Sequence, residues 1–375
     1  MTPDRRTFLQ CAAATSVAAA LPFVASSAQA QIPAQPQRTF SPQPGGWRTF
    51  DVTTRIDILK PEGATQVWLP VPAVETDWQR SLTSEFTSNG TARLADDKVY
   101  GVRLLHVEFT ASEKKPWVEL TSRVQTRNRA VNWQQRHPLR LDEAGQRFWT
   151  APTQLLPTDG VVREVAVRAS RGAHTDVEKV RRIYDWVVEN AFREPKTKGC
   201  GLGDIKTMLE SGYLGGKCAD INALFVGLCR AVGIPARDVY GIRVAPSAFG
   251  YKELGGNSAS LKGAQHCRAE VFLKGYGWVA MDPADVAKVM RQETPEWIKS
   301  TRHPLVVPVY QGLFGGWEGN WVGWNMAHDL RLPKQQGRDL PFFMYPTAET
   351  AAGPIDPYAP DDFKYQITAK EVTAA

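Results

Sequence analysis

Alternating apolar and polar residues mark much of the chain between residues 47 and 167. Four strand-like runs show it: FDVTTRIDIL (50–59), TQVWLPVP (65–72), YGVRLLHVEF (100–109) and WVELTSRVQT (117–126). A period of two places successive side chains on opposite faces of a strand. Several short strands separated by turn residues predict an N-terminal β-sandwich domain over residues 47–167.

The period changes to that of a helix after residue 174. HTDVEKVRRIYDWVVENAF (174–192) carries Thr175 and Glu178, which form a capping-box pair at the predicted helix start. In GGKCADINALF (215–225) a second apolar helical face begins directly after Cys218, and Gly233 ends that helix.

Three further strands follow the second helix. They are RDVYGIRV (237–244), HCRAEVFL (266–273) and WVAMD (278–282), the last two forming a predicted hairpin. Strands followed by helices and strands predict the α+β class, with a core over residues 168–290. Residues 291–375, rich in proline, glycine and tryptophan, are predicted to be a C-terminal extension packed on that core.

The first thirty residues have the pattern of an export signal. Arg5 and Arg6 form a twin-arginine pair, an alanine-rich stretch interrupted by Pro22 follows, and SSAQA (26–30) ends on small residues. We expect residues 1–30 to be a cleaved twin-arginine signal peptide and proline-rich residues 31–46 to be a linker. The stretch is too short for a membrane span, and no later run approaches one. A periplasmic protein without a span in its mature chain is therefore expected.

Composition narrows the range of partners. The 375 residues carry a net charge of +6, which falls to about +5 once Asp4, Arg5 and Arg6 are removed. No lysine or arginine run forms a nucleic-acid patch, so no nucleic-acid partner is expected. The mature chain keeps four cysteines, Cys200, Cys218, Cys229 and Cys267, too few and too irregularly spaced for a disulfide scaffold.

Cys218 stands where a thiol becomes reactive. A helix N-terminus carries partial positive charge and free N–H groups, which favour a thiolate and offer donors for an oxyanion. Lys217 beside it adds a further positive charge. The alternative is an ordinary buried structural cysteine.

A nucleophile of this kind needs a base and a group that orients the base. His266 opens one strand of the hairpin and Asp282 ends the other. The two share a face only if paired residues have numbers of equal parity, because side chains alternate along a strand. The hairpin loop must then hold three or five residues, and GYG (275–277) offers three, with Gly277 suited to the left-handed position.

These motifs together resemble a known family. GGKCADINALFVGLCRAVGIPARDVYGIRV (215–244) followed by HCRAEVFLKGYGWVAMDPADV (266–286) is similar to the core of the bacterial transglutaminase-like superfamily, whose members have a papain-like fold. The resemblance covers about residues 175–290, and VWLPVP (67–72) and FFMYPTAET (342–350) resemble the flanks of longer members. It implies Cys218 as nucleophile, His266 as base and Asp282 as the orienting residue.

One departure from the family pattern lies directly after the histidine. Cys267 and Arg268 stand where the family usually has a small residue and an aromatic one. By alternation Arg268 shares a face with His266 and Asp282, where it would lower the pKa of His266, pair with Asp282 or select an acidic substrate group. The alternative is a pair with Glu270 or a place at the rim. Lys217 and Arg268 are candidate substrate-binding residues.

The predicted activity is attack on an amide carbonyl through a thioester, most simply by a peptidase or amidase. The partner is a peptide or protein substrate, with cell-wall peptide as one candidate. A cross-linking transglutaminase and an inert periplasmic binding or scaffold module are the alternatives.

Other chemistries have weaker signals. Zinc could draw on Cys200, Cys218, Cys267 and a histidine, but the sequence has no metal-binding spacing, so no metal or other cofactor is expected. A disulfide from Cys200 or Cys267 to Cys218 would silence the nucleophile. The tail tryptophans, Trp317, Trp321 and Trp324, either stack on sugars or pack inside the protein.

Overall fold

The computed structural model describes residues 38–359 and 361–372, which belong to one unit, Arg38–Ala375. The predicted signal peptide (1–30) and the first part of the predicted linker lie outside the described residues. The described part of the linker, 38–46, forms no helix or strand, but it is anchored, because Phe40 is buried in the core. No helix in these two described ranges has both the length and the apolar character needed to cross a membrane.

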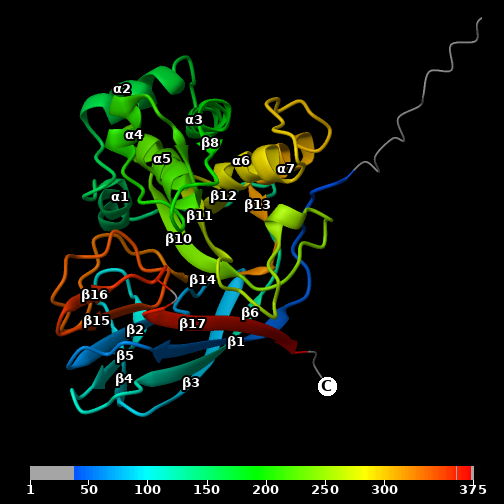
Figure 1. Cartoon of the computed structure of the whole chain (residues 1–375). Coiled ribbons are helices and arrows are strands. Elements are labelled where there is room, and N and C mark those ends of the chain that lie inside the picture. The colour runs from blue at the N-terminus through cyan, green and yellow to red at the C-terminus, as the bar shows by residue number, and fades with distance from the viewer. Residues whose placement is uncertain (1–37, 360, 373–375) are drawn as a thin grey trace, which may run out of the picture. The chain divides into compact units, whose positions relative to one another are not determined.

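Helices gather at one end of this unit around a small sheet, and two further sheets lie at the other end (Figure 1). The helices are α1 (Glu143–Thr150), α2 (Gly160–Ala169), α3 (Asp176–Asn190), α4 (Ile205–Ser211), α5 (Cys218–Ala231), α6 (Pro283–Gln292) and α7 (Val307–Gly312), with a 3₁₀ turn at Lys252–Leu254. The predicted capping box begins α3: Thr175 accepts from the Glu178 N–H, and the Glu178 carboxylate accepts from the Thr175 N–H.

Helix α5 is the centre of the predicted core. Every residue of α5 is buried, and the helix contacts α1, α2, α3, α4 and α6 as well as three strands. A helix apolar around most of its circumference fits such an enclosed position. Cys218 is the first residue of α5, as predicted.

The strands beside α5 form a four-stranded sheet in the order β12-β11-β10-β14. Their bounds are β10 (Ala236–Arg243), β11 (Gln265–Leu273), β12 (Gly277–Met281) and β14 (Trp321–Asn325). β11 and β12 form the predicted hairpin, and the pairing of Leu273 with Gly277 leaves a three-residue loop at 274–276. The loop length and the equal parity are confirmed. The loop begins one residue earlier than GYG, and Gly275 and Gly277 both have positive φ.

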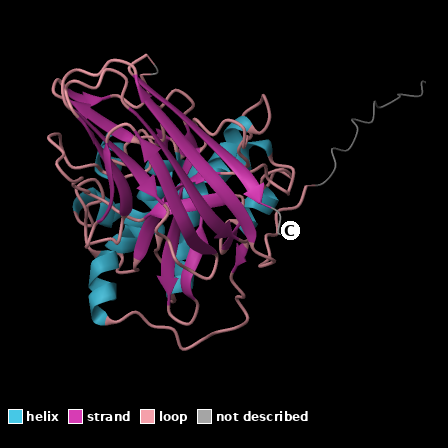
Figure 2. Ribbon diagram, turned by 90° about the horizontal axis from the view of Figure 1, so that it is seen from below, coloured by secondary structure: helices cyan, strands magenta, loops and turns pink. Residues whose placement is uncertain are grey.

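Two larger sheets stand below this core in Figure 1, and Figure 2 shows their strands from that side. One has the order β17-β1-β6-β3: β17 (Phe363–Val372), β1 (Arg48–Ile58), β6 (Trp117–Thr126) and β3 (Gln79–Ser88). The other has the order β16-β15-β2-β5-β4: β16 (Gly353–Ile355), β15 (Thr347–Thr350), β2 (Thr65–Val71), β5 (Arg103–Phe109) and β4 (Thr91–Asp96). Two short pairs complete the strands: β8 (Phe192–Arg193) with β9 (Gly215–Gly216), and β7 (Arg129–Ala130) with β13 (Gly316–Trp317).

Residues from the C-terminal region complete all three main sheets. β14 lies at the edge of the core sheet, β15 pairs with β2, and β17 pairs with β1 over the whole length of that strand. The predicted segments 47–167, 168–290 and 291–375 thus share their sheets, which periodicity within one segment does not reveal. A separate β-sandwich domain with those bounds stays a prediction. Trp317, Trp321 and Trp324 are buried, so they pack inside the protein.

Candidate active site

The start of α5 is held by a carboxylate that ties three backbone segments together. Asp220 accepts hydrogen bonds from the N–H groups of Lys217, Leu202 and Gly203, each at 2.9 Å. A Cβ at Gly201 would lie 1.8 Å from Asp220 Oδ2, and one at Gly216 would lie 2.5 Å from Asp220 Cβ. Glycine at both positions therefore lets the chain close around Asp220 and fixes the position of Cys218.

His266 and Asp282 meet across the hairpin. His266 Nε2 lies 2.7 Å from Asp282 Oδ2, and both residues are buried. Asn222, one turn after Cys218, donates from Nδ2 to Asp282 Oδ1 at 3.3 Å. Asp282 is also the N-cap of α6, where its Oδ1 accepts from the Asp285 N–H. One carboxylate thus orients the imidazole and begins a helix.

The structure adds a second carboxylate that the sequence analysis missed. Asp285 Oδ2 lies 3.4 Å from His266 Nε2, and Asp285 Oδ1 lies 2.5 Å from Arg243 Nη2. Arg243, on β10, also donates from Nη1 to the Leu254 carbonyl at 3.0 Å. The sequence DPAD (282–285) was the signal that could have revealed Asp285. Acidic residues favour the first turn of a helix, and helical side chains lean toward the N-terminus, where Asp282 caps this helix.

The protonation states favour an ion pair between the thiol and the imidazole. Burial opposes charge on His266, but the carboxylates of Asp285 and Asp282 outweigh it and raise the His266 pKa to about 9. Burial likewise opposes a thiolate at Cys218. Hydrogen bonds from Cys200, Cys267 and His266 overcome that effect and hold the Cys218 pKa well below its usual range.

Cys200 and Cys267 are the thiols that influence Cys218, and the Cys200 thiol itself donates to the Gln265 carbonyl at 3.3 Å. Hydrogen bonding to Cys218 and burial raise the Cys200 pKa well above that of an ordinary thiol; burial and the same contact raise the pKa of Cys267. Cys200, Cys218, Cys229 and Cys267 are all free thiols, so no disulfide silences Cys218 here. Cys229 lies in the core.

Arg268 lies behind the histidine–aspartate pair rather than at the rim. It is 2% exposed, its Nε is 3.7 Å from Asp282 Oδ2, and its Nη1 donates to the Glu318 carbonyl at 2.9 Å. The alternative of a pair with Glu270 is wrong, because Arg129 and Arg237 hold that carboxylate, and Arg237 faces it directly across β10 and β11.

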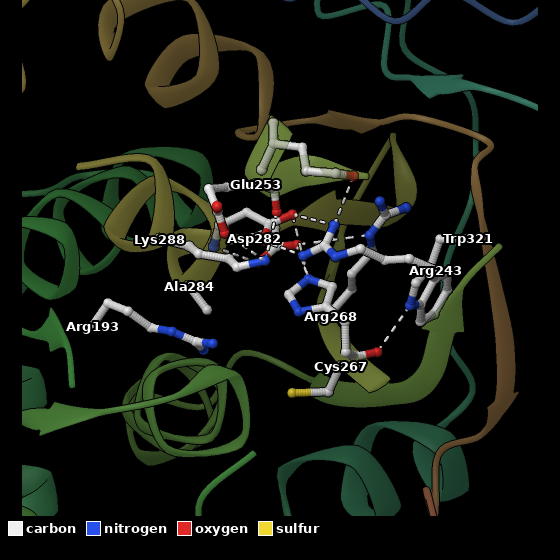
Figure 3. Close-up of polar contacts among 12 residues, drawn as sticks. Arg193, Arg243, Glu253, Cys267, Arg268, Asp282, Ala284, Lys288 and Trp321 are labelled. Atoms are coloured by element: carbon white, nitrogen blue, oxygen red, sulfur yellow. Dashed lines mark hydrogen bonds and ion pairs between the residues drawn. The ribbon is translucent and has the colours of Figure 1, made fainter. Parts of the chain in front are cut away.

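The rings of Trp317 and Trp321 also enclose Arg268, at 5.1 and 4.8 Å from the guanidinium carbon. Figure 3 shows Arg268, Arg243 and Asp282 in one cluster, with the Cys267 sulfur pointing away from it. This position suits Arg268 to holding Asp282, and its predicted contact with substrate finds no support in the burial.

Lys217 is the N-cap residue of α5 and is half-buried. Burial and the nearby positive charge of Arg193 lower the Lys217 pKa. Its predicted role in substrate binding stays a prediction.

A cavity of about 210 Å³ opens beside Cys218 and His266. The loop between β10 and β11 forms one wall through residues 255–257, 260 and 262–264, and Gln265, the first residue of β11, continues it. Arg193, Arg243 and Lys288 form the rest of the lining. The nucleophile and base candidates therefore face one common space.

Asp282, Asp285 and His266 form a group that could hold a metal ion. Donor atoms of His266, Asp282 and Asp285 lie within 4.8 Å of one another. Arg243 holds Asp285 and Arg268 approaches Asp282, so two guanidinium groups supply the positive charge that a metal ion would otherwise bring. The arrangement suits acid–base chemistry better than metal binding.

Comparison with known proteins identifies the domain in which these residues lie. The family model described as the transglutaminase-like superfamily matches residues 163–283, the span that holds Cys218, His266 and Asp282. A protein of Haemophilus influenzae, itself uncharacterized, is 33% identical over 344 residues, which cover 86% of this chain and 91% of its own length. Residues 163–283 form a transglutaminase-like domain.

A solved structure supports the fold of the chain around this domain. A crystal structure from Cytophaga hutchinsonii, assigned as a candidate cysteine protease, aligns with a TM-score of 0.56 at 16% identity. The alignment covers 89% of this chain and 93% of that chain, so the likeness extends beyond the core to the sheets around it. The periplasmic domain of TgpA from Pseudomonas aeruginosa aligns over 68% of this chain and 75% of its own, with 18% identity and a TM-score of 0.36, too low to support an argument.

Proposed function

We propose that this transglutaminase-like protein is a cysteine enzyme that cleaves amide bonds through a thioester, most simply as a peptidase or amidase. One observation carries the proposal: His266 is fixed by Asp282 at 2.7 Å and opens on the same cavity as Cys218, the first residue of a buried helix. The lowered pKa of Cys218 and the raised pKa of His266 support the roles of nucleophile and acid–base residue.

The proposed first step is attack of the Cys218 thiolate on the amide carbonyl. Asp282 occupies Nε2 of His266, which leaves Nδ1 to hold the proton given up by the thiol. The tetrahedral intermediate then collapses as this proton passes to the leaving amine and the C–N bond breaks. A thioester remains on Cys218, and His266 is neutral.

Water completes the reaction as a hydrolysis. His266 takes a proton from the water as it attacks the thioester and keeps it while the Cys218 sulfur departs as a thiolate, so the acid product leaves and the thiolate–imidazolium pair is regenerated. An amine in place of water would make the protein a cross-linking transglutaminase.

The N–H of Cys218 is the backbone donor best suited to the oxyanion. The next N–H of α5, that of Ala219, is already bonded to the Cys200 carbonyl at 2.9 Å. The positive end of α5 adds to the stabilisation of negative charge at this point.

A mass-resolved peptide assay tests the proposal. The protein is incubated with a mixed peptide library, with and without an amine donor. New masses of about +18, +1 or −17 then report cleavage, deamidation or cross-linking in the acyl-enzyme scheme. Cys218→Ala should abolish all three. Cys229→Ala is the matched control, because it removes a buried thiol outside the cavity. Activity that survives in Cys218→Ala would refute the proposal, and full inactivity of the wild-type protein would favour a binding module.

Export belongs to the same proposal. The twin-arginine pair falls within residues 1–37, outside the described residues, and periplasmic action on peptide substrates rests on that motif alone. Replacing Arg5 and Arg6 with lysine should retain the protein inside the cell, and fractionation of the producing cells measures this.

A further inference from the structure

The cavity beside Cys218 is lined by cations and by no acidic side chain of the described residues. Arg193, Arg243, Lys262 and Lys288 reach it, together with the polar residues Asn257, Ser260 and Gln265. Positive charge concentrated in a partly enclosed space attracts anions.

Two of the four cations are neutralised by neighbouring acids. Arg243 pairs with Asp285 at 2.5 Å, behind His266. Lys288 lies 3.2 Å from Glu253 Oε2 and donates to the Glu253 carbonyl at 2.7 Å. These cations contribute little net charge to the cavity.

The other two have no ion pair with a described carboxylate. Arg193 donates from Nε to the neutral amide of Gln292 at 2.9 Å, and the Lys262 Nζ lies 5.3 Å from the ring of Tyr365. β8 and β9 pair in parallel with Arg193 opposite Gly216, two residues before Cys218. Figure 3 shows the guanidinium of Arg193 extended toward the cluster around Asp282. Arg193 and Lys262 therefore offer charge that the protein leaves unpaired beside the nucleophile.

We propose that this cavity binds a carboxylate of the substrate, with Arg193 and Lys262 as the residues that determine this specificity. The substrate class is an acidic peptide or amide whose free carboxylate lies close to the bond that Cys218 attacks. At about 210 Å³ the cavity is smaller than the roughly 300–1,000 Å³ of sites for drug-sized ligands, so it holds one residue-sized group. This inference rests on the proposed function of Cys218.

Two alkylating reagents that differ in one charge test the site without knowledge of the substrate. Iodoacetate carries a carboxylate and iodoacetamide is neutral; each forms an S–C bond to Cys218 and releases iodide. The measured quantity is the rate of Cys218 alkylation by iodoacetate divided by the rate with iodoacetamide. We expect this ratio to fall about three- to tenfold in the Arg193→Gln/Lys262→Gln double variant, because two partly screened positive charges are lost. Arg193→Lys, which keeps the charge, should retain most of the ratio.

The control variant is Lys206→Gln, which removes an exposed lysine that lies 3.8 Å from Glu210 and does not line the cavity. Its ratio should equal that of the wild type. The imidazolium of His266 favours iodoacetate in every variant, so the change between variants measures the site. Lys262 is exposed, so Lys262→Gln alone tests the site if Arg193→Gln fails to fold.

The outcomes separate the two proposals. An unchanged ratio in Lys262→Gln and in the double variant, with rapid iodoacetamide alkylation, would overturn the carboxylate site and leave the acyl-enzyme proposal standing. If neither reagent modifies Cys218 faster than free cysteine, the proposed function fails, and the carboxylate site fails with it.

Discussion

The Cys218 side chain owes its lowered pKa to the residues around its sulfur. Burial alone would keep it a thiol, yet Cys200, Cys267 and His266 together lower its pKa. The pKa values of the two neighbouring thiols shift in the opposite direction and rise. The residue after the histidine, which departs from the family pattern as Cys267, thus takes part in the environment of the nucleophile.

The pH dependence of Cys218 alkylation follows from these shifts. Iodoacetamide should react at a high, nearly constant rate from well below pH 8.5, the ordinary thiol pKa, up to about pH 9, where His266 loses its proton. Rates measured from pH 4 to 10 by mass spectrometry test this. A single rise centred near pH 8.5 would show that the ion pair does not form.

His266 should also make stability depend on pH. Its pKa of about 9 in the folded protein exceeds the 6.5 of an ordinary histidine, so its stabilising contribution is complete below pH 6.5 and is lost as pH rises through 9. Urea unfolding at pH 6 and pH 9.5 measures the loss. His266→Gln should reduce the difference between the two pH values, and an unchanged difference would contradict the assignment.

Neutralising Asp282 should mainly lower activity, whereas neutralising Asp285 should mainly lower the free energy of unfolding. Asp282→Asn should lower activity about 10²–10⁴-fold with modest loss of stability, because the base loses its orienting carboxylate. Asp285→Asn should cost about 3–5 kcal/mol of stability, because it leaves the buried Arg243 without its partner. Urea unfolding and peptide turnover of both variants separate the two effects. Equal losses in both assays would contradict these separate roles.

At the scale of elements, the loop 201–203 and the first turn of α5 form one structure around Asp220. The loop donates two N–H groups to that carboxylate and the chain before α5 donates a third. The position of the nucleophile therefore depends on a segment some sixteen residues earlier in the chain, and on the glycines that allow the close approach.

A pair of glycine variants tests this dependence. Gly201 and Gly212 both have positive φ, but only at Gly201 would a Cβ meet Asp220. Gly212→Ala should cost about 1 kcal/mol through backbone strain and leave Cys218 alkylation unchanged. Gly201→Ala should cost more and slow alkylation by iodoacetamide. Equal alkylation rates in the two variants would show that Asp220 does not position Cys218.

At the scale of the whole molecule, the described chain is held together by strands distant in sequence. β17 closes one sheet beside β1 and also bonds the loop 258–261 through Ile367 and Ala369. That loop leads into the wall of the cavity. The last described strand thus links the outer sheet to the site.

Removal of the flanking strands should therefore abolish the core. Residues 163–290 expressed alone lack β14, which pairs with β10, and expose the buried faces of α5 and its sheet. We expect this fragment to be unfolded or aggregated, whereas residues 38–375 fold. Near-ultraviolet circular dichroism and thermal melting compare the two. A cooperative melt of the fragment would show that the core is an independent domain.

Local sequence determined the elements whose signals lie within a few residues. The capping box fixed the start of α3, the apolar face and Gly233 bounded α5, and strand parity required the odd hairpin loop that brings His266 to Asp282. Period and capping are short-range physics, so one stretch of chain contains all the information they need.

Tertiary structure decided everything that depends on partners far apart in the chain. The sequence allowed Arg268 to pair with Glu270 or with Asp282. In the folded chain Arg129 and Arg237 pair with Glu270, and Arg268 lies beside Asp282. Asp285, on α6, is held beside His266 by Arg243 of β10. Burial makes such choices, because an unpaired charge in the interior is costly and only the folded chain shows which partner is within reach.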